Sequence, residues 1–198
     1  TVTEDGETKT LGSVTITVQS GVTAITADTS SIEIDADNAK TASLSVTLKD
    51  AASGDVLAVR SSDESIVTVP ASVDASTGSC SVTLTAVKTG TATVTLSCGI
   101  ATAQVAVTVK ASGTHTVTFE KQKLTVKKDE TAVNPAKATD GDKLTYASSS
   151  TAVATVDSSG IVTGVAAGTA TITATVKNAY DVIVETASYT VEVADAYK

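Results

Sequence analysis

YASSSTAVATVDSSGIVTGVAAGTATITATV, residues 146–176, is the stretch that decides the fold. In its last part Ala170, Ile172, Ala174 and Val176 alternate with threonines. A period of two places one set of side chains on a buried face and the other set in water. Threonine suits the solvent face because it is β-branched and keeps its hydroxyl hydrated. The stretch therefore predicts β-strands, since a helix would spread these apolar residues around its circumference.

Two turns separate the strands of this stretch. Residues 157–160, DSSG, have the composition of a tight turn, in which Gly160 takes a positive φ at little steric cost. Gly168, directly before the alternating run, is predicted to do the same. The predicted order is strand, turn, strand, turn, strand.

These motifs resemble those of the bacterial immunoglobulin-like domain family, group 2. The shared pattern is a Ser-rich strand end, V-A-T-V, a D-x-x-G turn, G-x-V-T-G-V and A-G-T-A-T-I-T-A, and it extends over residues 148–174. The resemblance implies an immunoglobulin-like fold. It also implies modules of bacterial or bacteriophage surface proteins, which act as spacers, adhesive domains or virion decorations.

Length and composition favour two such domains. The chain has 198 residues, about twice what one small sandwich needs. Apolar residues make up 41%, with no Trp, no Met and a single Phe, Phe119, so the cores must be aliphatic. We expect an all-β protein: two tandem immunoglobulin-like Greek-key β-sandwiches preceded by a partial β-hairpin.

The net charge of the chain limits the classes of partner that it can bind. A net charge of −8 disfavours nucleic acid and anionic membranes as partners. No apolar run approaches the roughly 18 residues of a membrane span, so no direct membrane insertion is expected. The chain begins at Thr1 without a signal peptide, and we expect it to be a piece of a longer, exported polypeptide. The expected location is extracellular, on a bacterial cell surface or a virion surface.

A closing strand with three apolar residues at alternate positions occurs three times, at separations of 91 and 84 residues. Only the second and third of these closing strands are preceded by the other strands of a domain. This count predicts domains at 20–110 and 111–198. Residues 1–19 are then the closing hairpin of an upstream domain, or a strand donated to a neighbouring copy. The three closing strands carry Val14, Ile16 and Val18; Val105, Val107 and Val109; and Tyr189, Val191 and Val193.

The two bodies differ by an insertion. Residues 61–69 align with 148–156 at an offset of 87, whereas residues 88–97 align with 166–175 at an offset of 78. The first domain therefore carries nine extra residues within PASVDASTGSCSVTLTAV, residues 70–87. Both domains have a split first strand, with Ile25 and Ile34 matching Val117 and Val126 at an offset of 92.

Cys80 and Cys98 are the only cysteines. Each shares the parity of apolar neighbours, so both are predicted to face the core at the same end of the first sandwich. A disulfide there would add about 3 kcal/mol of stability and would indicate an oxidising compartment. The alternative is two buried thiols.

Few other residues offer chemistry. His115, the single histidine, is expected to be an exposed linker residue, without the partners of a zinc site or a catalytic triad. The carboxylate pairs 140–142 (DGD) and 35–37 (DAD) are weak calcium candidates that also fit ordinary turns. We expect no cofactor and no enzymatic activity. Tyr180, in the last hairpin loop, is a weak candidate for glycan contact.

Three functions fit these observations. The first is a structural or adhesive module of an extracellular bacterial surface protein, a stalk or spacer with weak contacts to host proteins or surface glycans. The second is an immunoglobulin-like decoration of a bacteriophage virion. The third is a subunit of an extracellular filament, assembled by strand donation from residues 1–19. In each, the main partners are neighbouring immunoglobulin-like domains of the same or adjacent chains.

Overall fold

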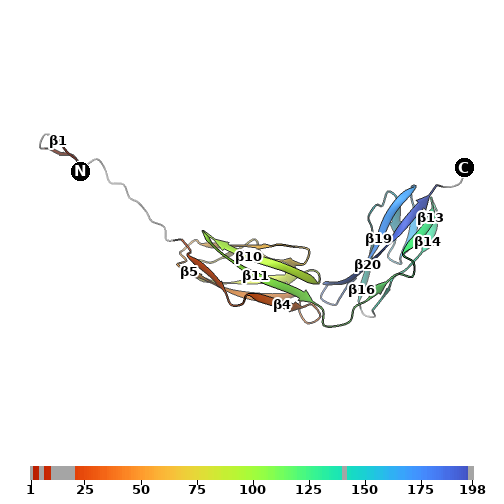
Figure 1. Cartoon of the computed structure of the whole chain (residues 1–198), viewed down its shortest axis with the longest axis horizontal. Helices are drawn as coiled ribbons and strands as arrows, with labels where there is room; N and C mark the ends of the chain where they lie inside the picture. The colour runs from red at the N-terminus through yellow and green to blue at the C-terminus, as the bar shows by residue number, and fades with distance from the viewer. Residues whose placement is uncertain (1, 5–6, 10–20, 140–141, 196–198) are drawn as a thin grey trace.

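The computed structural model describes residues 2–4, 7–9, 21–139 and 142–195. These residues form strands, turns and loops, and none of them is helical. Two β-sandwiches follow one another along the chain, and their long axes are inclined so that the pair forms an elbow (Figure 1). The predicted fold class, two tandem sandwiches preceded by a partial hairpin, is confirmed.

The first sandwich consists of two sheets. One sheet has the order β4 (Ser31–Asp35), β11 (Ala101–Lys110), β10 (Gly90–Cys98), β6 (Val56–Ser61) and β8 (Ser72–Asp74). The other has the order β3 (Ala24–Ala27), β5 (Thr41–Lys49), β9 (Ser79–Ala86) and β7 (Val67–Thr68).

The first strand changes sheets partway along, as the split pattern predicted. Its first half, β3, pairs antiparallel with β5, and its second half, β4, pairs in parallel with the closing strand β11. Ile32 and Ile34 thereby lie opposite Val107 and Val109. The switch ties the two sheets together through one continuous segment.

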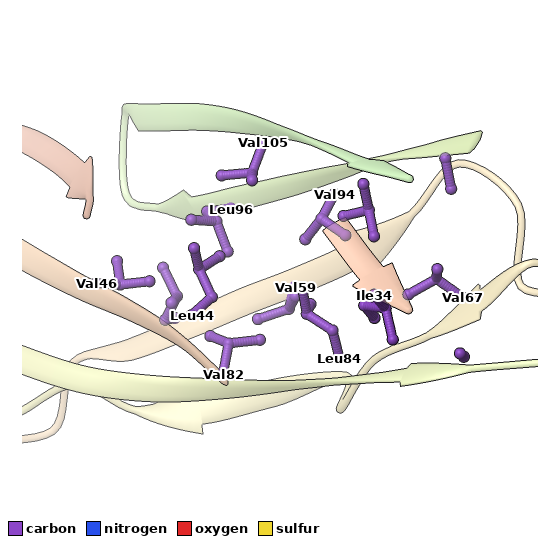
Figure 2. Close-up of a cluster of buried hydrophobic side chains, with 14 of the residues drawn as sticks. Ile34, Leu44, Val46, Val59, Val67, Val82, Leu84, Val94, Leu96 and Val105 are labelled. Carbon is purple, nitrogen blue, oxygen red and sulfur yellow. The ribbon is translucent and has the colours of Figure 1, made fainter. Parts of the chain in front are cut away.

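The core of the first sandwich is aliphatic, as the composition predicted. Along β5, Leu44, Val46 and Leu48 are buried and the residues between them are exposed. Figure 2 shows the buried side chains of both sheets filling the space between them. Each fully buried aliphatic side chain contributes about 1.5–3 kcal/mol, so this alternation is the main source of stability.

The second sandwich repeats the plan with shorter pieces. One sheet has the order β13 (Lys123–Lys127), β20 (Ile183–Ala194), β19 (Gly168–Lys177) and β16 (Lys143–Ser148). The other side is formed by β14 (Thr131–Val133), β18 (Ile161–Gly164) and β17 (Ala154–Val156), together with the pair β12 (Val117–Thr118) and β15 (Lys137–Ala138). Gly160 and Gly168 both have positive φ, at 79° and 148°, as predicted.

Pro135 interrupts the predicted strand over residues 132–138, and the chain forms β14 and β15 on either side of it. The interruption is held by polar contacts. The buried Asn134 side chain donates to the Lys121 carbonyl at 2.9 Å, and the Ala136 N–H donates to the Tyr146 hydroxyl at 2.9 Å. A proline within a sheet is tolerated where the ladder is already broken in this way.

The nine-residue insertion of the first domain becomes an additional edge strand. β8 pairs with β6, with Val56 opposite Asp74 and Ala58 opposite Ser72. The sheet therefore has five strands, whereas its counterpart in the second sandwich has four. A short edge strand protects the ladder of β6 from pairing with another chain.

The N-terminal partial hairpin consists of β1 (Val2–Glu4) and β2 (Glu7–Lys9), which pair antiparallel. The candidate donor residues Val14, Ile16 and Val18 lie outside the described residues, so their role in strand donation remains a prediction.

The two sandwiches differ at the pole where their closing strands end. In the second sandwich Lys128 and Gly164 form a parallel bridge that closes this pole. A Cβ added at Gly164 would lie 2.5 Å from the Lys127 carbonyl oxygen, closer than real contacts allow. The first sandwich has the buried Ala86 at the equivalent position, and its N–H donates to the Lys40 carbonyl as the Gly164 N–H donates to the Glu130 carbonyl. Among the described residues, Ala86 has no bridge like Lys128–Gly164.

Gly164→Ala should therefore lower the free energy of unfolding of the second sandwich by about 1–3 kcal/mol, because the added methyl must displace backbone. Urea denaturation measures the change. Gly21→Ala is the control, since a Cβ there meets nothing within 4 Å. Equal stability of the two variants would contradict the tight packing at this pole.

Candidate functional site: the joint between the sandwiches

The short segment 111–116 joins β11 to β12, and four segments of the chain meet around it. From the first sandwich come the loop after β4 and the segment Val87–Thr89. From the second come the loop Asn178–Val182 between β19 and β20 and the residue before β16, Asp142. We call this meeting point the joint.

A backbone ladder crosses the joint. Ile183, at the start of β20, forms a parallel bridge with Lys88. The Ile183 N–H donates to the Val87 carbonyl at 2.8 Å, and the Thr89 N–H donates to the Ile183 carbonyl at 2.9 Å. The second sandwich is thus hydrogen-bonded to the backbone of the first.

The loop before Ile183 places an apolar side chain in the neighbouring core. Val182 is fully buried and belongs to the hydrophobic cluster of the first sandwich. Its burial contributes about 1.5–2 kcal/mol. The core of the first sandwich is therefore completed by a residue of the second.

Asn178 holds this loop and also reaches across the joint. Its Oδ1 accepts the N–H groups of Tyr180 and Val182, both at 3.1 Å. Its Nδ2 donates to the Ala36 carbonyl at 2.7 Å and to Asp37 Oδ1 at 3.1 Å. The buried amide has partners for both donors and for its acceptor, as a buried polar group requires.

His115 bridges the two sandwiches. Its Nε2 lies 3.0 Å from Asp37 Oδ1 in the first sandwich, and its Nδ1 lies 2.8 Å from Asp142 Oδ2 in the second. Its side chain is only 13% exposed, so the expectation of an exposed linker residue was wrong. A neutral imidazole has one N–H, whereas two carboxylates require two donors. The geometry therefore favours the imidazolium.

The acidic pair at residues 35–37 binds the linker backbone. Asp37 Oδ2 accepts the Gly113 N–H at 2.7 Å, and Asp35 Oδ1 accepts the Ser112 N–H at 3.2 Å. Gly113 sits close, because a Cβ there would lie 3.1 Å from Asp37 Oδ2. These carboxylates thus have N–H partners within the protein.

The charged groups of the joint shift one another's pKa values. The hydrogen bond to Asp142 is the main factor that raises the pKa of His115; burial opposes the rise, and the contact with Asp37 adds to it. Burial acts to raise the pKa of Asp37, but hydrogen bonds from Gly113, Asn178 and His115 outweigh it and hold that pKa below its usual value. Both shifts favour the charged pair.

The sequence patterns had drawn attention to the two acidic pairs of the joint, but for a different role. The acidic pairs were singled out as calcium candidates; Asp35, Asp37 and Asp142 lie at the joint instead, while Asp140 is outside the described residues. Within the described residues, no group of three or more His, Cys, Asp or Glu side chains is arranged to hold a metal ion.

Asn178 and Val182 were not anticipated. A signal for them existed in the spacing of the repeats. The alternating runs of β10 and β19 match at an offset of 78 residues and the closing strands at 84, so the hairpin of the second sandwich is six residues longer. Those extra residues form the loop that enters the joint.

Cys80 and Cys98 lie at the same pole of the first sandwich and contribute to its core from opposite sheets, Cys80 half-buried and Cys98 buried. Both are free thiols in this structure, rather than the bridged pair considered above, so the disulfide remains a prediction. Burial, together with the charge of Asp74, raises the pKa of the Cys80 thiol.

Two further surface features are small. Tyr180 is exposed in the loop of the joint, and glycan contact at this residue remains a prediction. A pocket of about 200 Å³ lies beside β6, below the usual size of ligand sites. It is lined by Val59, Arg60, Ser61, Glu64, Val69 and Ala71.

One family model matches part of the chain, from the second half of β11 through the linker with His115 to the first residues of β20. Residues 106–186 match the bacterial Ig-like domain (group 2). The resemblance of residues 148–174 to this family is thus confirmed. The match ends within the closing hairpin of the second sandwich, just after the loop that enters the joint.

Solved structures with similar folds include domains of intimin, of an S-layer protein and of titin. A C-terminal intimin fragment, in complex with the intimin-binding domain of the translocated intimin receptor, is 21% identical with a TM-score of 0.35; the match covers 86% of this chain and 63% of that one. Domains 5–6 of the S-layer protein SbsC are 19% identical with a TM-score of 0.39, over 87% of this chain and 97% of that one. The I9–I11 tandem of titin is 14% identical with a TM-score of 0.33, and the match covers 87% of this chain and 66% of that one.

At these identities and TM-scores the likenesses carry no argument about function. This chain spans less than two thirds of the length of the intimin fragment. None of the curated proteins matches its sequence. Across the described ranges, no helix has the length and apolar character needed to cross a membrane.

The joint should be tightest in mildly acidic solution. Because the pKa of His115 is raised, its contribution is complete below the ordinary value of 6.5 and is lost as pH rises through the raised value. Because the pKa of Asp37 is lowered, its contribution is complete above 3.8 and is lost as pH falls through the lowered value. The charged hydrogen bonds, partly screened by solvent, are worth about 1 kcal/mol.

Distances between spin labels on the two sandwiches, measured at about pH 5 and about pH 9, should therefore broaden at the higher pH. In His115→Gln, whose amide cannot become a cation, the distribution should be the same at both values. Identical pH dependence in the variant and the wild type would contradict the role of His115.

Cys80 and Cys98 should be bridged in protein prepared under oxidising conditions. Thiol titration of the denatured protein should then give two thiols only after reduction, and reduction should lower the free energy of unfolding by about 3 kcal/mol. Cys80→Ser is the control, since its stability should not respond to reductant. Two titratable thiols without reduction would leave the alternative of two buried thiols.

Proposed function

We propose that this chain is a non-enzymatic structural and adhesive module of an extracellular bacterial surface protein, a stalk or spacer made of immunoglobulin-like domains. In this proposal both bodies, residues 20–110 and 111–198, are copies of the bacterial Ig-like domain, with the first copy altered by its insertion. Residues 1–19 belong to an upstream domain or act as a donated strand.

The observation that carries the proposal is the joint. A spacer must hold its far end at a distance, and domains on a free linker would fold back on one another. Here Val182 is buried in the neighbouring core, Ile183 pairs with Lys88, and His115 lies between two carboxylates from different sandwiches. These contacts support a pair that keeps a fixed elbow.

The surface supports the same role. The net charge of −8 favours solubility and keeps copies of the chain apart. The partners in this proposal are neighbouring immunoglobulin-like domains, with host proteins or glycans contacted weakly, Tyr180 being the glycan candidate. The joint favours the stalk over virion decoration or a filament subunit, since those roles do not require a rigid pair.

Val182→Asp tests the proposal, because burying an unpaired carboxylate in the first core is unfavourable by several kcal/mol and should open the joint. Distance distributions between labels on the two sandwiches should be narrow in the wild type and at least about twofold broader in the variant. Val133→Asp, at a position 59% exposed on β14, is the matched control and should leave the distribution narrow.

A broad distribution in the wild type would contradict the spacer role. The location is tested separately by labelling intact bacteria that express the full gene with an antibody against residues 21–194. Signal without permeabilisation is expected, and signal only after permeabilisation would contradict an extracellular location.

A further inference from the structure

Exposed apolar side chains gather at the N-terminal pole of the first sandwich. Ile100, at the tip of the β10–β11 hairpin, is 92% exposed, and Val56, at the start of β6, is 51% exposed. Ala58 pairs with Ser97, so Val56 lies at the same end of the sheet as the hairpin tip. The turn itself requires only Gly99, whose φ is 58°, and a polar residue would serve beside it at less cost. An isoleucine here calls for a partner.

The equivalent hairpin of the second sandwich shows where that partner lies. The pair Gly90–Val109 in the first sandwich corresponds to Gly168–Val193 in the second. Beyond the equivalent of Cys98–Ala101, the second hairpin continues into the loop that carries Val182 into the joint. The tip of this hairpin thus faces the sandwich that precedes it in the chain. By the same geometry, Ile100 faces the position of a sandwich preceding the first.

The register of the hairpin β1–β2 can be compared with the registers of the closing hairpins of the two sandwiches. Aligning Val14 with Tyr189 gives an offset of 175, which puts the paired residues Val2 and Lys9 at positions 177 and 184. The ladder of the second sandwich keeps this register as far as the pair Val176–Glu185, and it then shifts by one residue, so that Lys177 lies opposite Ile183.

Alignment with the first sandwich fails this test. Aligning Val14 with Val105, an offset of 91, would put Val2 and Lys9 at positions 93 and 100, whereas Thr93 pairs with Ala106. The register of the N-terminal hairpin therefore agrees with that of the longer closing hairpin of the second sandwich as far as Val176–Glu185, and it disagrees with that of the shorter hairpin of the first.

The C-terminal pole of the second sandwich shows what a sandwich of this kind presents. The Lys128–Gly164 bridge closes it, and the segment Val165–Ala167 beside the bridge is exposed, with Val165 at 38%. The equivalent segment of the first sandwich, Val87–Thr89, is half-buried beneath Ile183. The two segments have the same local geometry. The backbone N–H of Val165 donates to the Val153 carbonyl, just as the N–H of Val87 donates to the Ile66 carbonyl.

The two kinds of tip fit the two kinds of pole. The loop bearing Val182 enters the first sandwich at a pole without a Lys128–Gly164 type of bridge, which we call open. At the bridged pole of the second sandwich, which we call closed, a short tip can dock without inserting a side chain. The linkers agree, since six residues separate Val18 from Ile25 and seven separate Val109 from Val117. The shorter linker precedes the first sandwich, whose hairpin tip is also the shorter one, so the two sandwiches that it joins can lie closer together.

We propose that residues 1–19 close a preceding sandwich of the second kind, and that Ile100 and Val56 dock on its closed pole, at the segment equivalent to Val165–Ala167. The first sandwich then has a closed pole on its N-terminal side and presents its own open pole to the second sandwich. This inference rests on the proposed stalk function, and it names the neighbour that the N-terminal pole takes.

A chimera tests the first part. Residues 111–175 are placed directly before Thr1 of the full chain, so that residues 1–19 stand where 176–194 stand in the second sandwich. Residues 14–18 should become a closing strand, and their amide exchange should slow by at least about 100-fold relative to the unmodified chain. Unchanged exchange in the chimera would overturn the assignment of residues 1–19.

Docking is tested in the same chimera by Ile100→Ser and Val56→Ser. Each should broaden the distance distribution between the added sandwich and the first by at least about twofold. Val133→Ser in the last sandwich, a position exposed about as much as Val56 (59% against 51%), should leave it narrow. Protection of residues 14–18 without any effect of Ile100→Ser would overturn the docking and leave the hairpin assignment standing.

Two further readouts separate this inference from its alternatives. The distance distribution between labels on the first and the last sandwich of the same chimera, on either side of the joint, reports on the proposed stalk function alone. A broad distribution there contradicts the stalk function whatever the effect of Ile100→Ser. Concentration-dependent polymers of the unmodified chain, abolished by deleting residues 1–19, would instead establish strand donation to a second copy and overturn the inference.

Discussion

The burial of Val182 is the contact on which the arrangement of the two sandwiches depends. Its side chain lies in the core of the first sandwich while its backbone belongs to the loop before β20 of the second. That position requires Asn178 to hold the loop and brings Ile183 alongside Lys88. Each contact is worth only about 0.5–2 kcal/mol. Because they share one short loop, the cost of ordering that loop is met once for all of them.

Much of the fold was readable from periodicity, because a strand with one buried face must alternate. The run from Ala170 to Val176 predicted β19, and the difference between the two repeat offsets located the insertion that became β8. Pro135 predicted a weakened strand, and the structure breaks it into β14 and β15. Sequence patterns predicted the structure wherever it depends on residues that are close together in the chain.

The joint was not readable in the same way. His115 has no suggestive neighbours in sequence, since Asp37 and Asp142 lie 78 and 27 residues away. Composition argued against a zinc site or a triad, but it carried no information about a bridge between domains. Only the greater length of the second hairpin pointed toward the joint, and a length difference does not say what a loop touches. The acidic pair at residues 35–37 shows the same limit, because its partners are backbone N–H groups of a linker folded against it.

The parallel pairing of first and last strands has a mechanical consequence. In each sandwich the entering strand and the closing strand lie side by side over five residue pairs, Ser31–Asp35 with Ala106–Lys110, and Lys123–Lys127 with Thr190–Ala194. A pull along the chain drags such partners in opposite directions along their length. All the hydrogen bonds of the ladder are then loaded in shear together, instead of being opened one at a time. Tension applied to this polypeptide is therefore resisted by the strands through which it enters and leaves each sandwich.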